Sequence, residues 1–473
     1  MNKVKFAGIL ASVIMGVVNM SALDVYVEQP GTVRDLIDDA SAVTSLTVKG
    51  VIDATDLYFI GGELPSLKSL NLSGAEIAGC SGASVNGFNI YSADVIPQGA
   101  FAGSPVENIA FPTGKNLIIG DGAFMGSALT SVRLLSNVDS IGVGAFANCN
   151  SLADVAMPGC RIGAGAFADC PSLTKVSIGS NTSLPASTFR NCVSLAQITG
   201  SEYILSIGDM AFQGDKALKD FVFGARLNHI GKDAFASTGL SDAFLEKSVQ
   251  LTTVGARAFA GSDISQIKLP VCVNLIADGA FMNTCNLDSI EIPTQAVSIG
   301  KLALARSAAG KVILSNAVEY IDDYAMADMT GLETVDVLRL DAVPELGEDV
   351  WHGVDQESVT LKVYLNMSED YASADQWNKF TLDIEDGFNG VGDAYAAHYD
   401  VSSRFRGTEL LITSGAYDMA SVRIYDVAAH LLTTVTPFTD SVAIETASLP
   451  GNIFIISVTL RDGSVHSLKL ARN

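Results

Sequence analysis

The chain has 473 residues, too many for one compact hydrophobic core, so several domains or a repeated architecture must account for its length. Only 17% of the residues are charged and 43 are glycine, a composition that favours many short turns around a narrow apolar interior. The formal net charge of −23 repels phosphate backbones and anionic membranes, which argues against nucleic-acid binding.

The first 22 residues are typical of a secretory signal peptide. Two lysines precede an apolar run from Phe6 to Val18, and the small residues Ser21 and Ala22 then supply a cleavage site. A transmembrane helix needs about 20 apolar residues, and no later stretch of the chain reaches that length. We therefore expect an exported protein that has no transmembrane segment once residues 1–22 are removed.

Two early strands, Leu46/Val48 and Leu70/Leu72, predict an N-terminal cap within residues 23–93. The next apolar strand begins at Ile109, about 16 residues later than the repeat spacing described below would place it. This insertion is rich in small residues and carries Phe88 and Tyr91. Long loops are functional more often than short ones, so we regard it as a candidate binding loop.

One pattern then recurs: an aliphatic residue and usually Gly, two variable positions, Ala, and a large apolar residue. The large residue recurs every 21 to 25 positions over twelve copies, a period within the range of leucine-rich repeats. The twelve large residues are Phe101, Phe124, Phe146, Phe167, Phe189, Phe212, Phe235, Phe259, Phe281, Leu304, Met326 and Trp351.

Each copy also contains a short alternating pair of apolar residues, which predicts one half-buried strand per repeat. The pairs are Val132/Leu134, Val155/Met157, Val176/Ile178, Phe221/Phe223, Ile267/Leu269, Ile290/Ile292 and Val335/Val337. We expect the return segment with Ala and Phe to form a single helical or 3-10 turn. One repeat buries too few side chains to offset its ordering entropy, so the coils must stack about 4.8 Å apart into ladders of Phe, Leu and Ile.

Cysteines occupy a recurring position in these copies. Cys149, Cys170 and Cys192 lie three residues after the aromatic residue, and Cys285 lies four after it. We expect all four to be small, buried, apolar residues, because no CxxC or Cys/His spacing indicates a metal site or a disulfide framework.

The combination Ile-Gly-x-x-Ala-Phe-x-x-Cys-x-x-Leu-x-x-Val-x-Ile-Pro resembles the BspA-type leucine-rich repeat of bacterial surface proteins, and residues 141–157 match it almost position for position. The resemblance covers residues 94–383. Its last part resembles the family's terminal cap, at Pro344, Leu346-Gly347, Asp349, Val363, Tyr371, Ala374-Asp375, Trp377 and Phe380. The resemblance implies a secreted or cell-surface protein of the cell envelope, and several family members are implicated in adhesion to host proteins or other cells.

Residues 384–393 are rich in Gly and acids and break the period, which predicts a linker. Five later strands predict a small β-sandwich within residues 384–473, with Asp462-Gly463 as a hairpin turn. They are Glu409–Thr413, Ser421–Val427, Ser441–Ile444, Ile453–Leu460 and Val465–Leu470. The segments 422–427, 449–451 and 462–464 resemble the C-terminal sorting domain of type IX secretion in Bacteroidota, which implies a role in sorting or anchoring.

No catalytic, cofactor-binding or metal-binding residues are predicted. The five histidines are scattered singly, and no cofactor motif stands in a suitable structural context. The acid pairs Asp322-Asp323 and Glu348-Asp349 fall in repeat turns without the spacing of a calcium loop, so we interpret them as solvated turns.

The strand face of a solenoid forms an extended concave surface, where we place the candidate binding site. Its outward residues include an adjacent apolar pair, Val222 and Phe244, flanked by Lys268, with Arg133 and Glu291 on other strands. Such a pair on a polar face predicts an interaction hot spot, although exposed apolar residues are also tolerated without any function.

Together these patterns predict an α/β, β-rich leucine-rich-repeat solenoid over residues 23–383, followed by a C-terminal β-sandwich. The leading hypothesis is a monomeric, non-enzymatic adhesion protein that binds an extracellular or host protein or a surface glycan. The first alternative is an architectural spacer of the cell envelope without a specific ligand. The second is a glycan-active enzyme, which would need two acids about 5 to 10 Å apart in a cleft.

Overall fold

The computed structural model describes residues 21–85, 88–114, 116–180, 182–337, 342–364, 367–385, 401–406, 408–414, 418–426, 430–450, 453–461 and 465–471. The chain forms two compact units, one of Met1–Glu333 with Pro344–Asp355 and one of Thr334–Val343 with Gln356–Asn473. Residues 1–20 of the predicted signal peptide and residues 386–393 of the predicted linker lie outside the described residues.

The first unit begins with a four-stranded parallel sheet. Its order is β1 (Ser21–Val27), β2 (Val43–Ile52), β3 (Ser69–Ile77) and β7 (Asn108–Ala110). β2 and β3 contain the two strands that the sequence predicts. β1 is an addition, and its pairing with β2 runs in regular register through Leu23↔Leu46 to Val27↔Gly50.

A short helix α1 (Ala54–Glu63) joins β2 to β3 and was not predicted. The side chain of its N-cap residue, Asp53, accepts the N–H of Asp56 at 3.3 Å, and the Asp56 side chain accepts the N–H of Asp53 at 3.1 Å. This reciprocal capping box satisfies donors that the first helical turn leaves unpaired. The Asp56 carboxylate also accepts the N–H of Val33 at 2.8 Å and thereby fixes the 3-10 turn η1 (Val33–Leu36) against the helix.

Between β3 and β7 the predicted insertion contains a two-stranded antiparallel hairpin rather than an irregular loop. Its strands are β4 (Cys80–Val85) and β5 (Phe88–Tyr91). The edge of the solenoid therefore carries a β-structured extension at this point.

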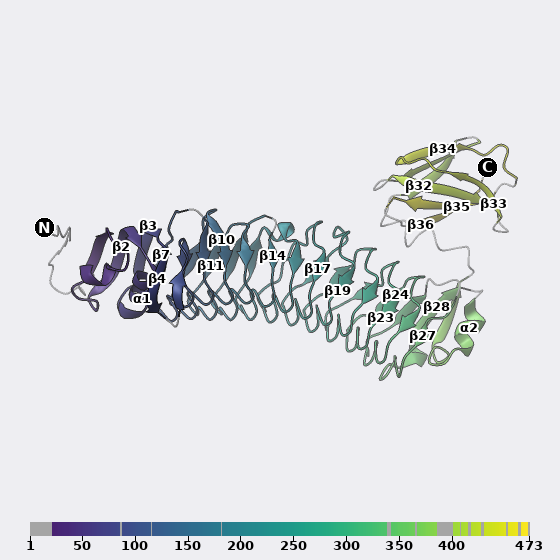
Figure 1. Ribbon diagram of the computed structural model, residues 1–473. Helices are drawn as coiled ribbons and strands as arrows, with labels where there is room; N and C mark the ends of the chain where they lie inside the picture. The colour runs from purple at the N-terminus through teal and green to yellow at the C-terminus, as the bar shows by residue number, and fades with distance from the viewer. Residues whose placement is uncertain are drawn as a thin grey trace, which may run out of the picture. The chain divides into compact units, whose positions relative to one another are not determined.

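Successive coils then stack along the chain in parallel register (Figure 1). Five of the seven predicted alternating pairs fall in or beside a first row of short strands. These are β9 (Ser131–Arg133), β11 (Asp154–Met157), β13 (Lys175–Ile178), β15 (Gln197–Thr199), β18 (Asp242–Phe244), β20 (Gln266–Lys268), β22 (Ser289–Glu291) and β24 (Lys311–Leu314). The solenoid that the sequence predicts is confirmed.

Each coil adds a second short strand that was not predicted from the sequence. This second row comprises β6 (Val95–Ile96), β8 (Leu117–Ile119), β10 (Val138–Ile141), β12 (Arg161–Ile162), β14 (Ser183–Leu184), β16 (Ser206–Ile207), β17 (His229–Ile230), β19 (Thr253–Val254), β21 (Leu275–Ile276), β23 (Ser298–Ile299), β25 (Tyr320–Ile321) and β27 (Glu345–Leu346). Two to four residues are too few to show a clear period of two, so only the stacking of neighbouring coils reveals these strands.

The consensus glycine after this strand has a packing reason. A Cβ on Gly163 would lie 2.4 Å from the carbonyl carbon of Gly142 in the preceding coil, so the main chains approach too closely for any side chain. The return segment that follows is not the predicted helical turn. It contains residues with left-handed φ, such as Gly144 at 58° and Asn148 at 59°, which divide it into separate tight turns.

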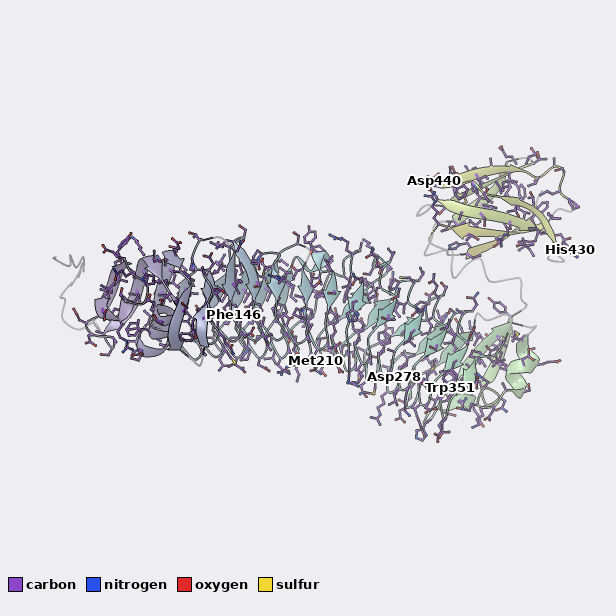
Figure 2. All side chains as sticks on the ribbon, in the orientation of Figure 1. Phe146, Met210, Asp278, Trp351, His430 and Asp440 are labelled. Atoms are coloured by element: carbon purple, nitrogen blue, oxygen red, sulfur yellow. The ribbon has the colours of Figure 1, made fainter. Side chains whose placement is uncertain are left out.

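The large apolar residue of each repeat forms one continuous column inside the solenoid. Neighbouring rings from Phe101 to Phe281 lie nearly parallel, with centroids 4.9 to 5.7 Å apart. Every ring in the column is fully buried, including Phe146, which is labelled in Figure 2. The prediction that successive coils share a ladder-like interior is confirmed.

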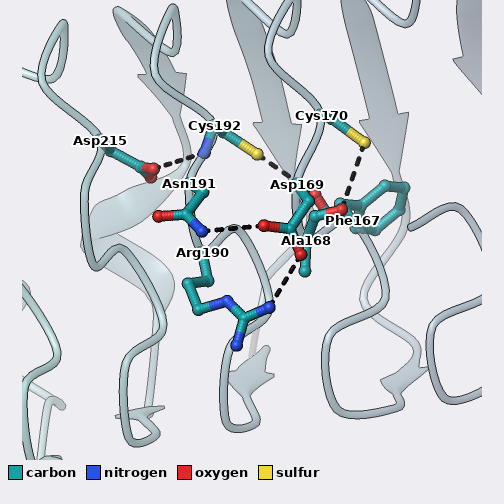
Figure 3. A network of polar contacts seen from close by, with 8 residues as sticks. All are labelled: Phe167, Ala168, Asp169, Cys170, Arg190, Asn191, Cys192 and Asp215. Carbon is teal, nitrogen blue, oxygen red and sulfur yellow. Dashed lines mark hydrogen bonds and ion pairs between the residues drawn. The ribbon is translucent and has the colours of Figure 1, made fainter. Parts of the chain in front are cut away.

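Beside the aromatic column runs a ladder of small polar residues, three positions after each large residue. Its members are Ser104, Ser127, Cys149, Cys170, Cys192, Asp215, Thr238, Ser262, Thr284 and Ser307, all buried. The Cys170 thiol donates to the carbonyl oxygen of Phe146 at 3.2 Å. The Cys192 thiol donates in the same way to the carbonyl oxygen of Phe167 at 3.2 Å (Figure 3). The predicted burial of these two cysteines and of Cys149 is confirmed.

The prediction for Cys285 is wrong, because this side chain is exposed. It lies four residues after Phe281, and the inward position at three is held by Thr284, whose hydroxyl donates to the carbonyl oxygen of Phe281 at 2.8 Å. A shift of one residue in the turn moves the side chain from the interior to the surface.

These environments predict distinct thiol reactivities. The neighbouring thiols, followed by burial, raise the pKa of Cys149 and Cys170, so little reactive thiolate forms there. In native protein at mildly alkaline pH, a disulfide reagent such as DTNB is expected to modify Cys285 rapidly and the three ladder cysteines only after unfolding in urea. Peptide mapping of the labelled protein measures this, and fast native labelling of Cys170 would contradict the buried ladder.

The second unit contains two parts. The first has three parallel strands, β26 (Thr334–Val337), β28 (Thr360–Tyr364) and β29 (Thr381–Glu385), together with the 3-10 turn η3 (Gln356–Ser358) and the helix α2 (Ser368–Ser373). Tyr371 and Trp377 are fully buried here and meet edge to face at 5.3 Å. These are residues of the predicted terminal cap.

The other part of the second unit has two antiparallel sheets, one of order β30-β31-β34 and one of order β33-β32-β35-β36. Their bounds are β30 (Val401–Arg406), β31 (Glu409–Ser414), β32 (Met419–Tyr425), β33 (Leu431–Val435), β34 (Ser441–Glu445), β35 (Ile453–Leu460) and β36 (Val465–Ala471). Buried residues of both sheets form one hydrophobic cluster, as in a sandwich. All five predicted strands form, while the predicted hairpin turn Asp462-Gly463 lies outside the described residues.

Candidate binding surface

The outward side chains of the first strand row contain the residues selected from the sequence. Phe244 ends β18 and Lys268 ends β20, and the two residues pair directly across these parallel strands. The Lys268 ammonium lies 5.7 Å from the centre of the Phe244 ring, a distance that permits a cation–π interaction. The Phe244 side chain nevertheless remains 43% exposed, so one part of its ring is open to a partner.

Val222 belongs to the preceding coil, where the predicted strand Phe221/Phe223 does not form. The Val222 N–H donates to the hydroxyl of Ser201 at 3.3 Å and not to a strand carbonyl. Ser201 begins the 3-10 turn η2 (Ser201–Tyr203), which interrupts the row between β15 and β18. The main chain is thereby displaced from ladder geometry, and the Val222 side chain is 60% exposed.

The register nevertheless places Val222 level with Phe244. The N–H of Ser241 donates to the carbonyl oxygen of Lys219 at 3.1 Å, the same kind of bond that precedes the paired strands elsewhere in this row. Val222 lies three residues after Lys219, and Phe244 lies three residues after Ser241. The two side chains therefore occupy the same position in adjacent coils. The adjacency that the sequence suggested therefore has a structural basis.

Two further exposed apolar residues lie in the loops that follow this row, and the sequence analysis did not select them. Tyr203 ends η2, and Val249 lies in the loop after β18, each 53% exposed. The two loops are linked through the coil between them, because Val222 bonds to Ser201 and the Ser248 hydroxyl donates to the carbonyl oxygen of Gly224 at 3.0 Å. Loop residues follow no period, so only their stacking brings them together.

We call Tyr203, Val222, Phe244, Val249 and Lys268 the central patch. Glu291 ends β22, the strand of the coil after Lys268, and the N–H of Asp288 donates to the carbonyl oxygen of Ser265 at 3.0 Å in matching register. Arg133 ends β9, five coils before Phe244 and roughly 24 Å away at the usual strand spacing of about 4.8 Å. It forms an ion pair with Asp154 at 3.6 Å and lies apart from the central patch.

The second candidate, the insertion, places Phe88 and Tyr91 at the two ends of β5. The Tyr91 ring meets Tyr58 of α1 edge to face, with centroids 6.1 Å apart. Partial burial, followed by the neighbouring Tyr58, raises the pKa of Tyr91 to about 12. Tyr91 therefore anchors the hairpin against α1, and the side chain of Phe88 lies outside the described residues.

Acidic residues in the turns have a main-chain role. The Asp323 carboxylate accepts the N–H of Glu348 in the next coil at 2.9 Å, and Asp278 accepts the N–H of Lys301 at 3.1 Å. Asp278 is labelled among the side chains of Figure 2. Backbone hydrogen bonds and Lys301 hold the pKa of Asp323 below its usual range, so this carboxylate stays ionised at neutral pH. The carboxylates of these turn residues therefore link neighbouring coils through hydrogen bonds to the main chain.

Within the described residues, no three His, Cys, Asp or Glu side chains gather closely enough to hold a metal ion. The same part of the chain contains no helix that is both long and apolar enough to cross a membrane.

Comparison with known families agrees with this geometry. A family model described as the BspA type leucine-rich repeat region matches in six copies, over residues 81–196, 158–251 and 228–354, which together exceed half of the chain. The chain belongs to the BspA-type leucine-rich-repeat family. Repeat proteins of this kind suggest a binding or adhesion role at the cell surface and are typically not enzymes.

Solved structures include similar folds. A leucine-rich repeat protein from Bacteroides ovatus ATCC 8483 is 15% identical, covers 81% of this chain and 99% of its own, and has a TM-score of 0.50. The pneumococcal vaccine antigen PcpA is 16% identical over 72% of this chain and 79% of its own, with a TM-score of 0.34. A leucine rich cell surface protein from Faecalibacterium prausnitzii A2-165 is 19% identical over 65% and 86%, with a TM-score of 0.32. No curated protein matches the chain in sequence.

Proposed function

We propose that this BspA-type protein is exported, is secreted or held at the bacterial cell surface, and binds protein or glycan partners through the outside of its solenoid. The observation that carries the proposal is the central patch, in which four exposed apolar side chains lie on three consecutive coils, two of them in the strand row and two in the loops that follow it. A clustered apolar patch on a rigid surface is typical of an interaction site, because its burial by a partner releases ordered water.

The rigidity comes from the interior. Stacked rings and inward thiols occupy the space beneath the strands, so only outward side chains are available to a partner. A surface that is ordered before binding loses little conformational entropy on association. The protein is proposed to act as a monomer without a cofactor.

Export and attachment are the finer part of the proposal. The N-terminal residues 1–22 have the pattern of a signal peptide, and the segments around Val422, Leu449 and Asp462 resemble the type IX sorting domain of Bacteroidota. We propose that the first directs export and that the C-terminal strands serve in sorting or anchoring. N-terminal sequencing of the protein recovered from the cell surface or medium tests the cleavage after Ala22.

Two variants test the site within one screen of the purified protein against immobilised extracellular-matrix proteins and polysaccharides. Phe244→Ala is expected to weaken binding of the captured partner about tenfold or more, as hot-spot aromatic residues do. Its free energy of unfolding should change by less than about 0.5 kcal/mol, because the ring is half exposed. Unchanged affinity removes the central patch from the binding surface and turns attention to the hairpin β4–β5, which a shortened variant tests on the same panel.

The architectural alternative makes the opposite prediction. A spacer of the cell envelope would capture no partner above background with either the wild-type chain or the variants. A glycosidase assay on the same polysaccharides tests the enzyme hypothesis, and release of sugars from any of them would overturn the non-enzymatic assignment.

A further inference from the structure

The second strand row ends in a sheet face that carries exposed apolar side chains. Its last four strands, β21, β23, β25 and β27, stack in parallel register, with Ser298 of β23 opposite Tyr320 of β25 (Figure 1). Leu275 and Tyr320 are each 36% exposed, and Val297, directly before β23, is 47% exposed. The carbonyl oxygen of Val297 accepts the N–H of Glu319 at 2.8 Å, so these side chains lie on successive coils.

The charge of the last coils in this row is strongly negative. Between Glu319 and Asp349 the sequence contains ten Asp and Glu and one basic residue, Arg339. Residues 274–318, which precede them, contain three acids and three bases and are neutral in sum. The negative charge is therefore concentrated in the coils that carry β25 and β27.

Most of these acids border the second strand row. Six of the ten lie in β25 and β27 or directly beside them, namely Glu319, Asp322, Asp323, Glu345, Glu348 and Asp349. The two bases of the preceding turn are engaged, because Lys301 donates to Asp323 at 3.3 Å and Arg306 donates to Asp328 at 3.2 Å. Among the described residues, the exposed glutamates of this set have no basic partner.

The strand register brings carboxylates to both sides of Tyr320. Tyr320 pairs with Glu345 across β25 and β27, and the N–H of Glu345 donates to the carbonyl oxygen of Glu319 at 2.9 Å. Partial burial and the nearby carboxylates, first that of Asp322, raise the pKa of Tyr320. An aromatic ring bordered by carboxylates attracts a cation both through its π-face and through the charges beside it.

The free carboxylates are arranged singly along the solenoid axis. Asp322 accepts the N–H of Asp323 at 2.7 Å, and Asp323 accepts that of Glu348 at 2.9 Å, so both aspartates are engaged with the main chain. Glu319 and Glu345 belong to neighbouring coils, about 4.8 Å apart at the usual strand spacing. Such an arrangement suits several cationic groups carried on one chain, each of which pairs with its own carboxylate.

We propose that this surface, the acidic face of Val297, Glu319, Tyr320, Glu345 and Glu348, is the docking site for a segment of a partner protein rich in lysine and arginine. The cationic groups pair with the three glutamates, and their aliphatic stems cover Val297 and the Tyr320 ring. The acidic face belongs to the second strand row, whereas the central patch belongs to the first row and its loops. It is therefore a second interaction surface, beyond the proposed function.

The long side chains of lysine and arginine distinguish a basic peptide from a cationic polysaccharide. Their methylene stems bury against apolar surface while the charged group reaches past it to a carboxylate. The planar guanidinium of arginine also stacks on an aromatic ring. An amino sugar carries its ammonium directly on the ring, so it has no such stem to cover Val297, which is half exposed.

The experiment uses the full-length protein and two fluorescein-labelled peptides, one that alternates Lys and Arg with Ser and one with Glu in place of each base. Fluorescence anisotropy is expected to show binding of the basic peptide alone, with an affinity that falls at raised salt. The triple variant Glu319→Gln, Glu345→Gln, Glu348→Gln is expected to weaken this binding about tenfold, and Tyr320→Ser several-fold. Chitosan oligosaccharide and Ca²⁺ serve as unlabelled competitors at matched ionic strength.

A matched control removes three exposed acids from the coils around the central patch. The control variant is Glu202→Gln, Asp220→Asn, Glu246→Gln, which changes the net charge by the same amount. It is expected to weaken binding of the basic peptide less than twofold, because its acids lie outside the acidic face. Both triple variants replace exposed carboxylates with amides of the same shape, so their urea midpoints should match that of the wild type.

Four outcomes overturn the inference. They are failure of the wild-type chain to bind the basic peptide, equal weakening by the two triple variants, chitosan binding that is tighter than peptide binding and lost in the acidic-face variant, and displacement of the peptide by micromolar Ca²⁺. If any of these occurs while Phe244→Ala weakens capture on the matrix panel, the proposed function stands. If the panel captures nothing and the basic peptide binds as expected, the central-patch proposal fails and the acidic face stands.

Discussion

Phe167→Ala is expected to lower the free energy of unfolding by about 3 to 5 kcal/mol, the largest stability effect that we predict for a single substitution in the solenoid. The Phe167 ring is fully buried between Phe146 at 5.2 Å and Phe189 at 5.6 Å. Its removal leaves a cavity that the coils cannot close, because main-chain hydrogen bonds such as Phe167 N–H to Thr188 O at 2.9 Å hold their spacing. Urea unfolding followed by circular dichroism measures the change.

The loss of stability caused by Phe167→Ala should be unevenly distributed along the solenoid. Each coil touches only its neighbours, so the destabilisation should be greatest in the coils next to the substitution. Amide hydrogen exchange is expected to accelerate first around residues 145–190 and least in the N-terminal sheet. Val143→Ala, an exposed apolar truncation in the same region, is the control and should change stability by less than about 0.5 kcal/mol. A loss below about 1 kcal/mol for Phe167→Ala would show that the column is loosely packed.

Asp215→Thr is expected to raise the free energy of unfolding at neutral pH by about 1 to 3 kcal/mol, although it removes a hydrogen bond. Asp215 takes the ladder position that Ser, Cys or Thr holds in other coils, and it is fully buried. One carboxyl oxygen accepts the Cys192 N–H at 2.7 Å (Figure 3), and the other has no partner. Threonine in this position can donate to the carbonyl of the aromatic residue three positions earlier, as Thr238 does to Phe235 at 2.8 Å.

The pH dependence follows from the same burial. Desolvation raises the pKa of Asp215 well above its ordinary value of 3.8, so the folded chain holds this proton at a pH where the unfolded chain has released it. Stability is therefore favoured below about pH 4 and declines as the pH rises toward the folded-state pKa. Asp215→Thr should abolish this decline, and its advantage should shrink as the pH falls.

Thermal or urea unfolding at a series of pH values measures this difference. Asp220→Thr is the matched control, since Asp220 is an exposed acid in the same coil. A parallel pH dependence in wild type and Asp215→Thr would mean that the buried carboxyl carries no proton linkage.

The period of the large apolar residue was enough to predict the solenoid and its aromatic column. A side chain that recurs every 21 to 25 positions next to Ala can be buried only if the coils stack, so Phe146 and its equivalents had to align. The same logic placed Cys149, Cys170 and Cys192 inside. It was wrong for Cys285, because a one-residue shift in a tight turn reverses the direction of a side chain.

Other elements lacked a readable signal or carried one that was overlooked. The second strand row is too short to show alternation, and its pairing exists only between coils. Helix α1 has a capping box from Asp53 to Asp56, a sequence signal that marks a helix start even in a segment containing two glycines. The strand expected at Phe221/Phe223 was lost because the inserted turn η2 supplies Ser201 as the partner of Val222.

The candidate binding surface, too, could be predicted from the sequence only in part. The sequence by itself determined that this is a stacked repeat protein with a closed interior, since burying one large side chain per period leaves no other arrangement. Only the tertiary structure decided which surface residues meet. Counting along the repeat was enough to align Val222, Phe244 and Lys268. The stacked loops add Tyr203 and Val249 to the patch, whereas Arg133 lies outside it. Periodic burial is a one-dimensional signal, whereas a binding patch is assembled from positions that share no period.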